Sequence, residues 1–177
     1  MLSVPPQASS LRAQLYPLAD ALGMTPAAVY ERQRELVRCD LLERKDGKGR
    51  GSGTPLSARS LATLLTGTLS TEKLSEVATE TPRILKAEAL DNKCPLTGAK
   101  TFEDALAIVL GGAGLYSRVL RVIVTQGVSA IIEFDFTGET TTQSVFTADR
   151  FANRPKRCLA ISVNGETLAE IAELLGE

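Results

Sequence analysis

A glycine between two stretches of helical periodicity constrains the local fold more than any other residue in this chain. Gly23 can adopt the positive φ that a sharp turn requires, and Thr25 and Pro26 follow it closely. Threonine is a good helix N-cap, and proline suits the first helical position because its missing N–H is not needed there. We therefore expect a helix opened by a proline at residue 17 and closed at Gly23, and a second helix over residues 26–39.

This order of helix, glycine turn and capped second helix is that of a helix-turn-helix, in which the second helix enters the DNA major groove. Helical periodicity directs Met24, Val29 and Leu36 toward the first helix and the core. The residues then expected near base edges, on the outer side of the second helix, are Thr25, Ala27, Ala28, Tyr30, Glu31 and Arg34. Arg32 and Arg38 are expected to contact phosphates.

A basic, glycine-rich segment at residues 46–53 follows the second helix. Residues 41–45 and 54–56 flank it and are expected to pair as strands, with Pro55 confining the second strand to an edge. The cations expected to contact phosphates from this hairpin are Lys45, Lys48 and Arg50. A solvated loop is the simpler alternative, and a nucleotide-binding loop does not fit because its glycines and lysine belong at a helix N-terminus.

Residues 18–56 resemble the winged helix-turn-helix of bacterial or phage transcription regulators, and the multiple-antibiotic-resistance-type (MarR-like) regulators are the nearest pattern. The resemblance is carried by Leu18-Ala-Asp-Ala-Leu-Gly-Met-Thr-Pro, by Leu36, by Leu41-Leu-Glu-Arg and by Asp46-Gly-Lys-Gly-Arg. It implies a recognition helix over residues 26–38 and a wing whose basic tip touches phosphates or the minor groove. Arg32 departs from the pattern, because such motifs have an aliphatic core residue at that place.

The pattern changes from helices to strands after Leu115. Helices are expected after Ser57, after Thr101 and after Asn164, whereas β-branched and aromatic residues predict strands at the positions 119–124, 128–136, 143–147 and 158–163. In the second of these strands Ile132, Phe134 and Phe136 alternate with polar residues and are expected on one buried face. The expected fold class is α+β, with a winged helix-turn-helix domain over 1–69, a helical connector over 70–115 and an α+β domain over 116–177.

Composition excludes several kinds of chemistry. The 177 residues include no His, which excludes Ser-His-Asp and Cys-His catalysis and imidazole metal sites. The three cysteines form no C-x-x-C pair, so they predict reduced thiols rather than disulfides or a zinc site. Glu133, Asp135 and Glu139 could share a metal ion, but a solvated strand face is the simpler interpretation. We therefore expect no enzyme activity, no metal and no cofactor.

The formal net charge is −1, but its distribution is uneven. Basic residues gather in the N-terminal third, whereas the C-terminal end carries Glu166, Glu170, Glu173 and Glu177. We expect a sequence-specific transcription regulator that binds double-stranded DNA, as a homodimer joined through the C-terminal domain. The alternative is a protein-interaction or assembly module that uses a winged-helix scaffold and binds a protein partner through its acidic C-terminal helix. No apolar run is long enough to span a membrane and no signal peptide is evident, so we expect a cytoplasmic protein.

Overall fold

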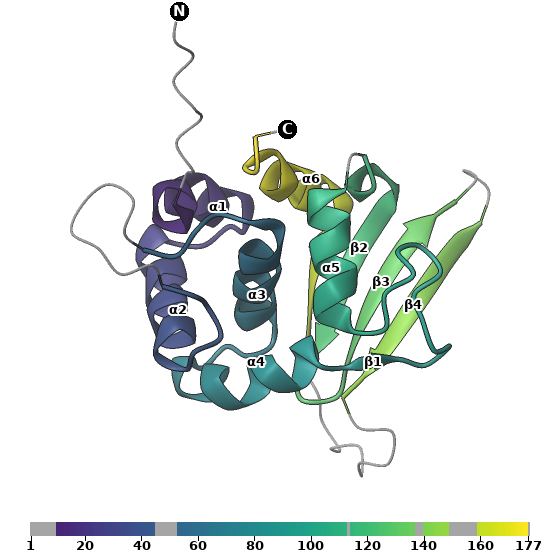
Figure 1. Cartoon of the computed structure of the whole chain (residues 1–177), viewed down its shortest axis with the longest axis horizontal. Coiled ribbons are helices and arrows are strands. Elements are labelled where there is room, and N and C mark those ends of the chain that lie inside the picture. Colours follow the sequence, from purple (N-terminus) through teal and green to yellow (C-terminus); the bar gives the residue numbers. More distant parts are fainter. Residues whose placement is uncertain (1–9, 45–52, 113, 137–139, 149–158, 177) are drawn as a thin grey trace, which may run out of the picture.

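The structure, a computed structural model, describes residues 10–44, 53–112, 114–136, 140–148 and 159–176. The fold is α+β, as predicted, and Figure 1 shows helices α1 to α4 on one side of the molecule and the sheet on the other, with α5 and α6 between them. The α-helices are α1 (Leu15–Ala21), α2 (Pro26–Arg38), α3 (Ala58–Leu69), α4 (Val77–Leu85), α5 (Phe102–Gly111) and α6 (Gly165–Glu173). The strands are β1 (Glu88–Ala89), β2 (Val119–Thr125), β3 (Ser129–Asp135), β4 (Thr141–Thr147) and β5 (Ala160–Asn164). Among the described residues, no helix is both long and apolar enough to cross a membrane.

The turn between α1 and α2 has the geometry that its residues predict. Gly23 has a φ of +62° and donates its N–H to the carbonyl of Asp20 at 3.0 Å, while Met24 donates to Ala19 at 2.8 Å. This pair of bonds is a Schellman motif, which satisfies carbonyls that the end of α1 leaves free. Thr25 then caps α2, because its hydroxyl accepts the N–H of the third helical residue at 3.2 Å. The predicted glycine turn and threonine cap are therefore confirmed, although α1 begins at residue 15 rather than at residue 17.

A second turn of the same kind ends α2. It occupies the residues where one strand was predicted. Asp40 has a φ of +56°, and the N–H groups of Leu41 and Leu42 both donate to the carbonyl of Leu36, at 2.9 and 3.3 Å. These two donors are used by the end of the helix and cannot join a ladder. The expected strand at residues 41–45 is therefore wrong for its described part, 41–44, where no strand forms.

The return segment of the expected hairpin pairs with a different part of the chain. Pro55 forms an isolated antiparallel bridge with Ser10, and Leu11 donates its N–H to the carbonyl of Thr54 at 2.9 Å. This contact places the base of the segment beside the start of the N-terminal helices. The predicted hairpin tip, with Lys45, Lys48 and Arg50, lies outside the described residues.

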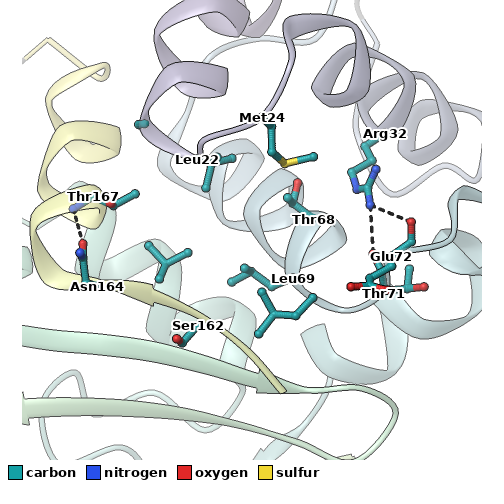
Figure 2. A pocket seen from close by; sticks show the side chains of 13 residues that line it. Leu22, Met24, Arg32, Thr68, Leu69, Thr71, Glu72, Ser162, Asn164 and Thr167 are labelled. Atoms are coloured by element: carbon teal, nitrogen blue, oxygen red, sulfur yellow. Dashed lines mark hydrogen bonds between the residues drawn. The ribbon is translucent and has the colours of Figure 1, made fainter. Parts of the chain in front are cut away.

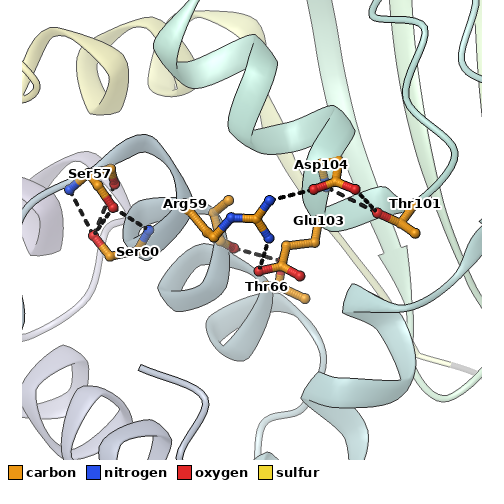
Figure 3. A network of polar contacts seen from close by, with 8 residues as sticks. Ser57, Arg59, Ser60, Thr66, Thr101, Glu103 and Asp104 are labelled. Atoms are coloured by element: carbon orange, nitrogen blue, oxygen red, sulfur yellow. Dashed lines mark hydrogen bonds and ion pairs between the residues drawn. The ribbon is translucent and has the colours of Figure 1, made fainter. Parts of the chain in front are cut away.

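Helix α3 is the central element that joins the N-terminal helices to the rest of the fold. A capping box of Ser57 and Ser60 begins it, and an added Cβ at Gly67 would lie 3.0 Å from a methyl group of Leu36 on α2, which shows how closely the two helices cross. On its other side, Arg59 pairs with Glu103 at 2.9 Å and with Asp104 at 2.5 Å, at the start of α5 (Figure 3). The helix expected after Ser57 is confirmed and runs to residue 69.

The antiparallel sheet has the strand order β1-β4-β3-β2-β5. Its inner face packs under α5 and α6, where the rings of Phe102 and Phe146 meet edge to face at 5.5 Å. Ile132 and Phe134 are fully buried as predicted, but Phe136 is 45% exposed. The prediction for Phe136 is wrong because β3 ends at residue 135, so the alternation no longer applies. One continuous cluster of buried apolar residues runs from Leu11 to α6.

Candidate nucleic-acid interface

The N-terminal half of α2 presents small residues to solvent. Thr25 and Ala27 are exposed and Ala28 is half-buried. Their side chains are short, so this end of the helix can approach another surface closely. The structure thus brings three of the predicted base contacts to one end of the helix, directly after the Schellman turn.

Tyr30 lies one turn further along the helix and contacts two arginines. The guanidinium carbon of Arg12 lies 5.5 Å from the centre of the Tyr30 ring, and that of Arg34 lies 5.9 Å from it. Such cation–π contacts hold the positive groups beside the ring without neutralising them. Arg12 was not among the predicted site residues, because it lies in a short 3-10 helix (Leu11–Gln14) before α1 and nothing in its local sequence indicates that it reaches Tyr30.

These residues line a hollow of about 550 Å³ on the outer side of α2, which we call the arginine groove. Its charged and polar lining includes Arg12, Tyr30, Glu31, Gln33, Arg34, Glu35, Arg38 and Arg44. The lining thus contains four arginines and two glutamates, and residues 44, 53 and 54 contribute to it from outside α2. The balance of charge in the groove is positive although the net charge of the chain is −1.

The two acids of the groove are paired with arginines on their own helix. Arg34 donates to both carboxylate oxygens of Glu31, at 3.0 and 3.1 Å, and Arg38 forms an ion pair with Glu35. The hydrogen bond from Arg38 holds the pKa of Glu35 below its usual value. Side chains of Arg34 and Arg38 are 62% and 75% exposed, so solvent or a ligand can reach both guanidinium groups. In the part of the chain that the structure describes, Arg12 forms no ion pair.

Arg32 lies on a different side of α2 from Arg34. Its Nη2 donates to the carbonyl oxygens of Thr71 and Glu72, at 3.1 and 3.2 Å, beyond the C-terminal end of α3 (Figure 2). Burial lowers the pKa of Arg32, and the nearby negative charge of Glu72 partly offsets that effect. The structure therefore does not bring Arg32 into the arginine groove, and its position between two carbonyls explains how an arginine is accommodated at a usually aliphatic place in the motif.

Gln33 is a buried polar residue at the floor of the arginine groove. Its exposed fraction is 7%, and its Oε1 has no hydrogen-bond partner among the described residues. A buried amide oxygen without a partner costs free energy. Gln33 was not among the predicted site residues.

Glu133 and Cys94 lie apart from the arginine groove. Within the described ranges, no group of three or more His, Cys, Asp or Glu side chains lies close enough to hold a metal ion. Glu133 instead pairs with Arg121 at 2.6 Å on the neighbouring strand. Cys94 is buried, and burial is the largest of the effects that raise the pKa of Cys39.

Comparison with known proteins adds no relative: no protein-family model matches the chain, and no curated protein or solved structure matches it. Function is therefore inferred from the turn between α1 and α2 and from the arginine groove.

Proposed function

We propose that the chain binds double-stranded DNA through the outer side of α2 and acts as a transcription regulator. The observation that carries the proposal is the arginine groove, where exposed guanidinium groups of Arg12, Arg34 and Arg38 lie beside a capped helix that follows a Schellman turn. An exposed helix of this kind fits the major groove, while guanidinium groups beside it can contact phosphates on the flanking backbone.

The proposal assigns different tasks to the two halves of α2. The exposed N-terminal residues, Thr25 and Ala27, approach base edges, with Tyr30 beside them. Arg34 and Arg38, further along the helix, contact phosphates or a guanine edge, because a guanidinium can donate to either. Lys45, Lys48 and Arg50 extend the same surface in this proposal. A homodimer would place two such helices in successive major grooves, and a cytoplasmic location fits this role.

A fluorescence-anisotropy titration with random-sequence duplex DNA tests the proposal. The wild-type chain should bind with an affinity that falls steeply with salt, because each phosphate contact releases a counterion and adds roughly 0.9 to the slope of log K against log salt. The variant Arg34→Ala should bind more weakly and with a smaller slope. The matched control is Arg118→Ala, which removes an exposed arginine from a distant part of the fold. Absence of binding at low salt, or equal losses in the two variants, would overturn the proposal.

A protein-interaction module is the second candidate function, and the apolar residues on the sheet side of the molecule favour it. Leu120 is 46% exposed and Phe136 is 45% exposed, while α6 presents Glu166 and Glu170 to solvent. Exposed leucine and phenylalanine side chains are common at interfaces. If this candidate is correct, Leu120→Ser should abolish self-association or capture of a partner while Arg34→Ala has no effect on either.

A further inference from the structure

A second hollow, of about 500 Å³, lies between the helix-turn-helix, the C-terminal end of α3 and the junction of β5 with α6 (Figure 2). We call it the Arg32 pocket and define it by Leu22, Met24, Arg32, Leu69, Val163 and Thr167. Its volume is in the range that small-molecule sites typically have. The pocket is lined by three segments that are far apart in the sequence, so it exists only in the folded chain.

The wall of the Arg32 pocket is mixed, and one part of it is apolar. Leu22 and Met24 come from the turn after α1, Leu69 from the end of α3, and Val163 from β5. Figure 2 shows Leu22, Met24 and Leu69 around the same space. A ligand with an apolar body would remove this surface from water, which is favourable in proportion to the area buried.

Arg32 is the one cation among the described residues that line the pocket. Two carbonyl oxygens accept hydrogen bonds from its Nη2, but the Nε atom is buried and has no partner in the described part of the chain. No carboxylate forms an ion pair with this guanidinium within those residues. A half-buried guanidinium that lines a hollow can bind an anionic oxygen there, because the oxygen adds a charge-assisted acceptor to the two backbone carbonyls.

Glu72 is the acidic residue that also lines the pocket, and it opposes an anion there. Its side chain belongs to an exposed residue, and only its backbone carbonyl accepts a hydrogen bond from Arg32. Removal of its charge should therefore strengthen the binding of an anion, while removal of the charge of Arg32 should weaken it. The two residues give variants with opposite expected effects at one site.

We propose that the Arg32 pocket binds a small amphipathic carboxylate, with the carboxylate on the guanidinium of Arg32 and the apolar body against Leu22, Met24 and Leu69. The turn between α1 and α2 forms part of the wall, so an occupant touches the segment that sets the angle between these helices. An effect of the bound carboxylate on DNA binding rests on the proposed function, but the binding of the carboxylate to the pocket does not.

A competition assay without DNA tests this inference. The reporter is 1-anilinonaphthalene-8-sulfonate, an amphipathic anion whose fluorescence rises in apolar surroundings, and the competitors are octanoate and neutral 1-octanol. Octanoate should displace the reporter from the wild-type chain. Arg32→Gln should weaken octanoate binding by roughly tenfold or more, the effect of one charged hydrogen-bonding group, while Glu72→Gln should strengthen it. The affinity for 1-octanol should be the same in the three proteins.

Two further variants test whether octanoate binds in the pocket itself and whether loss of any positive charge has the same effect. Thr167→Phe fills the pocket but keeps the cap of α6, because Thr167 donates to Asn164 through its backbone N–H at 2.8 Å; it should abolish displacement by octanoate without lowering the melting temperature. Arg118→Gln is the control for loss of one positive charge and should leave octanoate binding unchanged. Equal octanoate affinity in the wild type and Arg32→Gln, or no displacement at millimolar octanoate, would overturn the inference. Neither result bears on the DNA titration, so the two proposals can fail separately.

Discussion

Two arginines on α2 stand two residues apart and lie in opposite surroundings. Arg34 is exposed, pairs with Glu31 on its own helix and lines the arginine groove. Arg32 is half-buried, donates to two backbone carbonyls and lines the Arg32 pocket. The same residue type therefore serves two purposes on one helix. An exposed guanidinium is available to a partner, whereas an anchored one holds the helix to the rest of the fold.

Removal of the exposed arginines should have the largest effect on DNA binding. In the double variant Arg12→Ala/Arg34→Ala, DNA affinity should fall by about tenfold to a hundredfold, and the salt slope by about two, because two phosphate contacts are lost. Anisotropy titrations at several salt concentrations measure both quantities. An unchanged slope with weaker binding would show that these arginines do not contact phosphates.

Loss of Arg32 should lower the stability of the fold more than loss of Arg34, although Arg34 is the residue expected to matter for DNA binding. Arg32→Gln removes two hydrogen bonds from a charged donor to carbonyls beyond α3, and should lower the free energy of unfolding by about 1–2 kcal/mol. Arg34→Gln should change it by less than about 0.5 kcal/mol, because exposed ion pairs contribute little. Urea denaturation compares the two variants directly. Equal losses would remove the distinction between an anchored and an available arginine.

Gln33 lies between the two arginines in sequence and tests the cost of a buried polar group. Gln33→Met keeps a side chain of similar shape and removes the Oε1 atom that has no partner among the described residues. We expect the free energy of unfolding to rise by about 0.5–1 kcal/mol in the same denaturation assay. A loss of stability instead would mean that the amide of Gln33 has a partner in solution.

Neutralising an acidic residue of the arginine groove should have the smallest effect on DNA affinity. Glu31→Gln frees Arg34 from its ion pair and removes one negative charge from the groove, so DNA affinity should rise by about twofold to fivefold, as expected for an exposed pair. Glu72→Gln, near the Arg32 pocket, is the matched control and should leave DNA affinity unchanged. If Glu31→Gln weakened binding, Glu31 would be a direct contact.

Local features of the sequence predicted local features of the structure well. Gly23 and Thr25 specify a turn and a cap within a few residues, and both are confirmed. The direction of the Arg32 side chain was not predictable in this way, since the carbonyls that accept its hydrogen bonds belong to Thr71 and Glu72, about 40 positions further along the chain. Arg12 was missed for the same reason, because its contact with Tyr30 depends on how the segment before α1 packs against α2.

The expected strand after α2 illustrates a conflict between pattern and geometry. Leu41 and Leu42 have the apolar character of a short strand, but their N–H groups donate to Leu36 once Asp40 takes a positive φ. Aspartate tolerates that conformation better than most residues, yet its identity alone does not indicate that the helix will end there. The two N–H groups could serve either a strand ladder or the end of the helix, and the carbonyl of Leu36 accepts both.

A single fluorescent reporter on each candidate surface distinguishes DNA binding by α2 from binding by the sheet. The chain contains no Trp, so Tyr30→Trp in the arginine groove and Leu120→Trp on the sheet side each introduce one indole fluorophore. If the outer side of α2 binds DNA, duplex DNA should change the emission of Tyr30→Trp in a manner that added salt reverses, and should leave that of Leu120→Trp unchanged. A response from Leu120→Trp alone would contradict the account and place the binding surface on the sheet.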